Sequence, residues 1–329
     1  MDICEPRVSR EPDAGHGSLD DAPRTLVVSA FPSSEGPRVS IRRTAIEADD
    51  DFLGDFHVYE PHRAGLPRMR PYFRELWRRR EFAFEMAKSS IRVHHQDTAL
   101  GVLWNVLNPL LLASVYYVLV MVLRGGSDKL PSGYFAHLLA GLFAFYLVSG
   151  AMAGGASSVI SASKIIMNTA FPRMLLPLST VYVAVRKFVP TMAIFLLAAV
   201  ISHLSFSWVQ LLAIPMLVLI IVFATGLAML LATLQVYFRD TTSFLPYFVR
   251  IWLYLSPVLY YPENVPEKLK ILEFANPLFS LLGGWGDLLV RGELIPWSMW
   301  LQAFAWAFGT LIAGALVFMS RERDFAVRL

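Results

Sequence analysis

The chain has 329 residues, of which 55% are hydrophobic and 17% are charged, against about 25% charged in ordinary soluble domains. This composition excludes a soluble globular protein and indicates a polytopic membrane protein. The single cysteine excludes an intrachain disulfide and nothing indicates a metal site. The net charge of +3 bears on orientation in a membrane, so no nucleic-acid partner is expected.

Residues 1–70 are rich in Pro, Asp, Ser and Arg and show no sustained apolar period, which is typical of a disordered segment. The chain does not open with a basic start followed by an apolar signal segment, so we expect this tail to stay in the cytoplasm. The predicted organisation is a disordered cytoplasmic tail over 1–70, an amphipathic interface helix over 71–99 and a transmembrane domain over 100–329.

The interface helix is predicted from apolar residues that recur at helical spacing, with basic residues mainly elsewhere around the helix. This composition is typical of a helix lying flat on an anionic membrane surface. A solvated helix that covers protein is the alternative interpretation. The residues expected to anchor the helix at the interface are Trp77, Arg78, Arg79 and Arg80.

The stretch LGVLWNVLNP, residues 100–109, joins this helix to the first long apolar run. We expect Trp104 to anchor at headgroup depth and Pro109 to permit a bend, because proline removes one helix hydrogen bond. Asn105 and Asn108 would be costly facing lipid, so they are predicted to face protein or an aqueous substrate pathway. Simple anchoring without any transport contact is the alternative for Trp104.

Six apolar runs are long enough to cross a membrane as helices of about 20 residues. Their bounds are roughly 102–123, 134–157, 178–201, 208–234, 243–261 and 296–318. A shorter apolar run over 278–290, interrupted by Gly283, Gly284 and Gly286, is predicted to form a re-entrant hairpin buried against protein. Lys and Arg are more frequent at the span ends that lie on the same side of the membrane as the N-terminus. Because basic residues favour the cytoplasmic side, both termini are predicted to be cytoplasmic. The predicted fold class is an all-α membrane protein with six transmembrane helices, an N-terminal amphipathic interface helix and a re-entrant hairpin before the last span.

The second and third spans each carry a feature with two interpretations. Gly150, Gly154 and Gly155 form a small-residue face that allows close helix packing, either between two protomers or within one. Arg186 and Lys187 either contact substrate or snorkel to the inner interface, and we favour snorkelling.

The fifth predicted span places Tyr247, Arg250, Tyr254 and Tyr261 on one face if it is a continuous helix. Aromatic faces stack on sugar rings, and a cation among them can meet a diphosphate. This face is therefore predicted to line the substrate pathway. Packing of the rings against neighbouring helices is the alternative.

Several function classes lack their characteristic residues in this sequence. There is no GxxxxGK[ST] loop, so the chain does not bind ATP by that route, and there is no HExxH metal motif. Few charges lie inside the spans, which disfavours a proton or sodium relay. We interpret the chain as a passive pore-forming subunit, without catalytic residues, that a separate protein drives. The rival classes are a membrane-embedded glycosyl- or acyltransferase and an ATP-independent lipid flippase.

Five segments, in order, resemble the transmembrane subunit of the ABC-2 type polysaccharide exporters, which export O-antigen, teichoic acid and related lipid-linked glycans. They are LGVLWNVLNP at 100–109, KIIMNTAFPR at 164–173 with LPLS at 176–179, VYFRD at 236–240, SPV at 256–258 with Tyr260, and NPL at 276–278. The resemblance covers residues 72–329. Within this family, the sequence most resembles the actinobacterial members, in particular the mycobacterial galactan exporters, because it has a long polar tail and uses Arg more often than Lys.

The resemblance implies a homodimer in the bacterial cytoplasmic membrane with the pore between the protomers. It also implies that two cytoplasmic ATP-binding subunits drive export of a polyprenyl-diphosphate-linked polysaccharide. ATP and Mg would be bound by those partners, and this chain would bind no cofactor of its own. Membrane lipids are the remaining partner.

The loop between the second and third spans is the expected point of energy input. Residues 161–163 are typical of a helix start. The Phe171–Pro172 pair is typical of a helix end, because a residue before proline disfavours helical geometry. Together they predict a short helix between these positions. The resemblance implies that this is a coupling helix, moved when the ATPase subunits close on ATP. An ordinary positive-inside loop is the alternative. The coupling residues assigned on this basis are Lys164, Asn168, Phe171, Pro172 and Arg173.

Overall fold

The computed structural model describes residues 69–95, 103–126, 130–131, 133–202, 204, 206–261 and 270–329, all within the compact unit Glu60–Leu329. All regular secondary structure in these ranges is helical, which confirms the all-α part of the predicted fold class. The tail expected over 1–70 lies outside the described residues except for Met69 and Arg70, which begin helix α1.

Five helical segments in the described part are long and apolar enough to cross a membrane, namely Val106–Arg124, Tyr134–Ser161, Leu175–Ile201, Trp208–Tyr237 and Trp297–Arg328. They correspond to the first, second, third, fourth and sixth predicted spans. The helices that form them are α3 (Trp104–Arg124), α4 (Tyr134–Ser161), α6 (Leu175–Ile201), η3 (Trp208–Leu212) with α7 (Ala213–Tyr237), and α11 (Trp297–Arg321) with η8 (Glu322–Asp324) and α12 (Phe325–Arg328).

The span predicted over 243–261 differs in the structure. Helix α8 covers Thr241–Tyr254, and the chain continues through turns from Leu255 to Tyr260. Fourteen residues extend only about 21 Å, which is less than the hydrocarbon thickness of about 30 Å. The helix ends early because Pro257 disfavours helical geometry at Ser256. A six-span count based on one continuous helix here is not confirmed.

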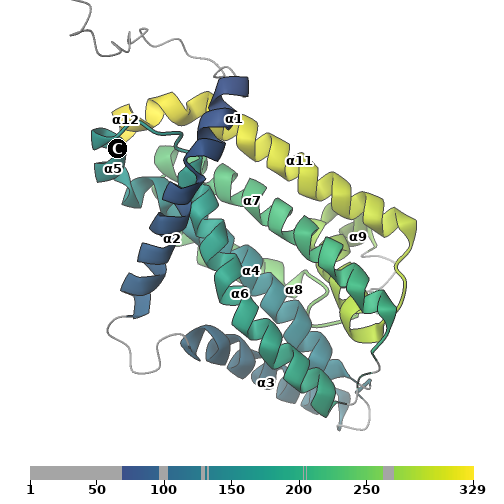
Figure 1. Ribbon diagram of the computed structural model, residues 1–329. Helices are drawn as coiled ribbons and strands as arrows, with labels where there is room; N and C mark the ends of the chain where they lie inside the picture. The colour runs from purple at the N-terminus through teal and green to yellow at the C-terminus, as the bar shows by residue number, and fades with distance from the viewer. Residues whose placement is uncertain are drawn as a thin grey trace, which may run out of the picture. The chain divides into compact units, whose positions relative to one another are not determined.

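Helices α4 and α7 form the centre of the bundle, with α6 beside α4 and α11 beside α7 (Figure 1). Of the apolar window of α4, 78% is buried inside the chain, against 22% for α3. A helix that is apolar all round is expected to be buried. The contact between α7 and α11 is closest at Gly226, where an added Cβ would lie 2.4 Å from the Thr310 carbonyl carbon.

The glycines of α4 pack within the protomer. A Cβ at Gly155 would lie 2.5 Å from the Cα of Ala228 on α7, and one at Gly154 would lie 2.9 Å from the Thr180 Cβ on α6. Gly150 is more open, with the Ala184 Cβ at 3.8 Å. Gly154 and Gly155 are therefore accounted for by packing inside one chain.

The segment over 278–290 is one helical piece, so the two-armed hairpin is not confirmed. It follows α9 (Ile271–Ala275) and consists of η6 (Phe279–Gly283), α10 (Gly284–Gly286) and η7 (Asp287–Arg291), with π-helical hydrogen bonding at both ends. All three glycines have right-handed helical dihedrals. They allow close packing instead of breaking the chain, since a Cβ at Gly286 would lie 3.1 Å from the His137 ring.

Helices α1 (Met69–Arg78) and α2 (Arg80–His95) lie across one end of the bundle, beside α5 (Ser163–Asn168) and α12 (Figure 1). We call this the α5 end, and the end that holds α9 the α9 end. A separate apolar cluster fills the α5 end, where Tyr72 and Leu76 of α1 pack near Phe318 and Phe325. Thus the interface helix covers protein on at least one side.

Substitution of Gly226 by alanine should separate α7 from α11 and lower the free energy of unfolding by about 1–3 kcal/mol through overpacking. The thermal unfolding midpoint of the purified chain in detergent measures this loss. Gly309→Ala is the matched control on α11, because an added Cβ there would meet nothing within 4 Å, and it should keep or slightly raise the midpoint. Equal midpoints for the two variants would contradict the close helix contact.

Candidate functional site

Helix α5 presents an open surface at the α5 end. Lys164 and Asn168 are both exposed one helical turn apart, and the Asn168 amide donates to the Lys164 carbonyl oxygen at 2.8 Å. Between them, Met167 is 65% exposed. The predicted short helix is therefore present, although it ends at Asn168, before the Phe171–Pro172 pair.

Residues 171–173, after α5, are turned toward the protein. Pro172 is buried, and Phe171 and Arg173 are half-buried. The Phe171 ring packs on Phe82 of α2 with ring centroids 5.0 Å apart. The structure thus divides the predicted coupling residues into an exposed pair on α5 and an internal group after it.

A buried carboxylate, that of Glu322 at the end of α11, holds the loop over 169–174 in place. It accepts hydrogen bonds from the backbone N–H of Arg173 and, at 2.6 Å, from the Tyr72 hydroxyl of α1. The Arg173 guanidinium donates to the Glu322 carbonyl oxygen. Burial, and next the Glu322 carboxylate, raise the pKa of Tyr72 above its usual range, so this hydroxyl stays a donor.

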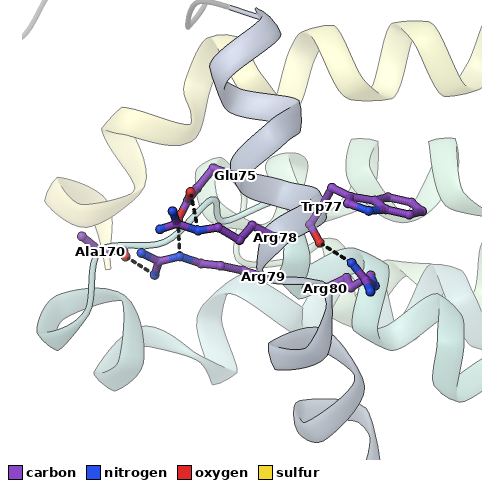
Figure 2. A network of polar contacts seen from close by, with 6 residues as sticks. All are labelled: Glu75, Trp77, Arg78, Arg79, Arg80 and Ala170. Atoms are coloured by element: carbon purple, nitrogen blue, oxygen red, sulfur yellow. Dashed lines mark hydrogen bonds and ion pairs between the residues drawn. The ribbon is translucent and has the colours of Figure 1, made fainter.

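Arg79, at the bend between α1 and α2, supplies a second attachment. Figure 2 shows Arg78 and Arg79 both turned toward Glu75, with Arg79 also reaching the same loop. Its guanidinium donates to the Ala170 carbonyl oxygen at 2.8 Å. We call the residues Tyr72, Glu75, Arg79, 170–173 and Glu322 the α5 junction.

The remaining predicted anchors stay at the surface. Trp77 is 71% exposed. The Arg80 guanidinium lies 5.1 Å from the Trp77 ring centroid and donates to the Trp77 carbonyl oxygen (Figure 2). Arg78 is also exposed. An exposed indole with a flanking cation is compatible with anchoring at a lipid surface, whereas Arg79 is engaged within the chain.

The loop that precedes α8 is joined to the C-terminal helix α12. The Tyr237 hydroxyl donates to Asp324 at 3.1 Å, and the Arg328 guanidinium lies 4.3 Å from the Tyr237 ring centroid. The Gln235 amide donates to the Arg239 carbonyl oxygen at 2.8 Å. The VYFRD stretch is therefore a structural connection between α7, α8 and the chain end.

A cavity of about 550 Å³ lies between α3, α4, α6 and α8. Its aromatic and polar lining includes Trp104, Asn108, Phe143, Tyr146, Lys187, Phe188, Thr191 and Thr242. Its volume falls within the usual range of small-ligand pockets, about 300–1,000 Å³. Asn108 and Trp104 both line this cavity, and Trp104 is 43% exposed. The side chain of Asn105 lies outside the described residues.

The predicted pathway face of α8 is open but shorter than expected. Tyr247 is 66% exposed, Tyr254 is 51% exposed, and Arg250 is exposed between them. The Tyr116 hydroxyl of α3 donates to that of Tyr254 at 3.1 Å. Arg250 follows Val249, which lines the cavity, so the exposed face of α8 adjoins the cavity wall.

Tyr261 does not share this face. It lies after the end of α8, is only 8% exposed, and packs 4.3 Å from the His137 ring and 5.5 Å from the Arg291 guanidinium. The prediction assumed a continuous helix through Pro257, and that assumption fails because α8 ends at Tyr254. Tyr261 belongs to the packed α9 end.

The Asn276 side chain joins two of the segments singled out in the sequence, SPV at 256–258 and NPL at 276–278. Its side-chain oxygen accepts from Trp252 Nε1 at 2.9 Å, and its amide donates to the Leu255 carbonyl oxygen at 2.9 Å and to the Ser256 hydroxyl. The amide thereby satisfies backbone freed where α8 ends. Within the described part of the chain, no group of three His, Cys, Asp or Glu residues could hold a metal ion.

A family model described as ABC-2 type transporter matches residues 83–284. The chain belongs to the ABC-2 type transporter family. Among curated proteins, this ABC-2 chain is 31% identical over 214 residues to an O-antigen export system permease protein RfbA of Klebsiella pneumoniae, covering 64% of this chain and 80% of that protein. It is 27% identical over 257 residues to the RfbA protein of Myxococcus xanthus, covering 77% and 97%.

Removal of the Glu322 carboxylate should loosen the loop over 169–174 of this ABC-2 chain. Glu322→Ala removes the carboxylate that accepts from the half-buried Tyr72 hydroxyl and from the Arg173 N–H, a cost of about 1–3 kcal/mol, which corresponds to about tenfold or more faster local opening. Hydrogen exchange of the loop amides measures it. Glu293→Ala, a 58% exposed side chain at the α9 end, should leave the loop unchanged. Equal exchange in both variants would remove Glu322 from its holding role.

Proposed function

We propose that the chain is the permease subunit of an ABC exporter that moves a polyprenyl-diphosphate-linked polysaccharide outward across the bacterial cytoplasmic membrane. The observation that carries the proposal is the membership of the ABC-2 family together with a partly open cavity whose α8 wall adjoins an exposed cationic and aromatic face. The RfbA relatives, described as O-antigen export permeases, support a glycan as substrate. Cell-wall galactan is our specific candidate.

The α5 end is proposed to be cytoplasmic and to receive two ATP-binding subunits. Helix α5 offers an exposed, mixed polar and apolar surface of Lys164, Met167 and Asn168 to such a partner. ATP and Mg would be held by the partners, so this chain acts as a conduit. Two copies would pair to enclose the pore, with the open face of α8 at its wall. Residues 241–261, a short helix followed by a buried turn, would form the fifth of the six predicted crossings.

The primary test is depletion of the chain in its own host. Lipid-linked glycan should accumulate on the inner leaflet while its synthesis continues, which inverted membrane vesicles and a sugar-specific probe can measure. If export continues after depletion, the proposal fails. The identity of the accumulated sugar decides whether the substrate is galactan.

The α5 junction should be required to couple ATP hydrolysis to export. Arg173→Glu places a second carboxylate beside Glu322, and Phe171→Ala removes the contact with Phe82, so movement of α5 should no longer reach α1 and α11. In proteoliposomes of the full complex, ATP hydrolysis should persist while export falls about tenfold or more. Pull-down of the ATPase should survive, because the exposed surface of α5 is untouched. Lys88→Glu, an exposed change on α2, is the control, and coupled turnover in both junction variants would contradict this role.

Arg250 should act on the substrate and not on assembly. Arg250→Ala removes a cation from the open face of α8 and with it one charge-assisted hydrogen bond to the substrate, worth about 1.5–3 kcal/mol. The export rate should therefore fall by about tenfold or more. Dimerisation and ATPase association should stay as in the wild type. Ile251→Ala, its exposed neighbour, serves as the control for a general effect of truncating this surface. Unchanged export by Arg250→Ala would exclude it from the pathway.

A further inference from the structure

A groove of about 380 Å³ lies between α7 and α11 and shares no lining residue with the cavity between α3, α4, α6 and α8. Its apolar wall consists of Leu230, Leu231, Leu234, Phe238 and Val317. Leu234, Phe238 and Val317 are exposed. The groove is therefore an open apolar surface between two spanning helices, separate from the proposed export path.

Arg321 is the polar lining residue of this groove that remains accessible. The Thr233 hydroxyl donates to the Met229 carbonyl oxygen at 3.1 Å, and the Tyr237 hydroxyl donates to Asp324 at 3.1 Å, so both hydroxyls are used within the chain. The Arg321 side chain is 57% exposed, and its guanidinium lies 3.9 Å from Asp324 and 5.7 Å from the Tyr237 ring centroid. An exposed ion pair of this length contributes little, so Arg321 can bind an anion.

Two more guanidiniums lie at the same end of the groove. That of Arg328 is 4.3 Å from the Tyr237 ring centroid, and the exposed Arg239 donates to the Arg328 carbonyl oxygen at 3.5 Å. Asp324 faces the same tyrosine. In the part of the chain that the structure describes, positive charge thus exceeds negative charge around the Tyr237 ring.

This charge lies where two spanning helices end, because α7 ends at Tyr237 and α11 at Arg321. From there the leucines of the groove follow α7 back to Leu230, a distance of about 10 Å. Basic pockets between spanning helices bind phospholipid headgroups, and a guanidinium matches the geometry of a phosphate. A ligand that fits both parts has an anionic phosphate and an apolar chain. A free anion would leave the apolar wall uncovered.

We propose that the groove between α7 and α11 binds an anionic phospholipid, with its phosphate on Arg321 and one acyl chain along Leu230, Leu231 and Leu234. The lipid belongs to the surrounding bilayer and is not the exported substrate, so the inference goes beyond the proposed function. Only the assignment of the lipid to the cytoplasmic leaflet rests on that function. The bound lipid joins the ends of α7 and α11 beside Glu322 of the α5 junction.

The test titrates the purified full-length chain in dodecyl maltoside with dioleoyl phosphatidylglycerol and, separately, with dioleoyl phosphatidylcholine. A lipid that binds the folded chain raises its thermal unfolding midpoint, so each titration gives an apparent dissociation constant. Phosphatidylglycerol should bind about tenfold or more tightly, because it brings the phosphate without a choline cation. Arg321→Gln should abolish this preference. Arg186→Gln, which removes an exposed arginine of α6 outside the groove, is the matched control and should keep it.

A second variant tests the apolar wall with the charges intact. Val317→Trp fills the groove and should weaken binding of phosphatidylglycerol by about tenfold or more. Ile312→Trp, at an exposed position of α11 outside the lining, should not weaken it. Phosphatidylglycerol with a photoreactive acyl chain should label residues 230–238 of the wild type.

Equal binding of the two lipids by the wild type, or an unchanged preference in Arg321→Gln, would overturn the site. An equal rise of the midpoint with inorganic phosphate at the same concentration would show that a free anion is bound, and would overturn the lipid as ligand. Labelling confined to other segments would contradict the assigned groove. The effect of depleting the chain on export does not depend on any of these results.

Discussion

The organisation of the α5 end depends on one buried carboxylate. Glu322 accepts from residues that lie about 150 and 250 positions away in the chain, the Arg173 N–H and the Tyr72 hydroxyl. A buried charge is stable only when its hydrogen bonds are satisfied. Removal of one partner leaves the remaining polar groups without that hydrogen bond, which lowers the free energy of unfolding. Helix α1, the loop after α5 and the end of α11 are therefore constrained to move together. Displacement of α5 by a partner would reach two sides of the bundle at once.

The two sides of the bundle differ in how tightly they are packed. On one side, Gly155 and Gly226 bring α4, α7 and α11 into backbone contact, and such close-packed interfaces resist continuous deformation. On the other side, α3 is largely unburied and α8 ends after fourteen residues, and the cavity lies between them and α4 and α6. A force applied at the α5 junction should therefore deform the wall of the cavity before it deforms the glycine-packed core. The cavity and the least tightly packed part of the molecule coincide.

The sequence predicted most of the elements but few of their long-range contacts. Apolar runs identified five spanning segments, and a helix start at 161–163 with the Phe171–Pro172 pair identified the short α5, because these signals are local properties of the sequence. Tyr261 was misplaced because helical spacing was extended through Pro257, and Gly283, Gly284 and Gly286 were interpreted as breaks although they serve close packing. Glu322 carried no local signal at all. An acidic residue directly after an apolar span is ordinary in sequence, and only the fold brings Tyr72 and Arg173 to it.

The polar side chains of the bundle fall into two groups with different surroundings. At the ends of the bundle, Glu322 and Asn276 each satisfy several donors or acceptors of the same chain, as a purely structural group should. Along the cavity, the side chain of Lys187 is half-buried and that of Asn108 is exposed, so their polar atoms stay accessible. Internal hydrogen bonds therefore hold the two ends of the bundle, whereas the polar groups on the loosely packed side between α3 and α8 are left accessible to a ligand.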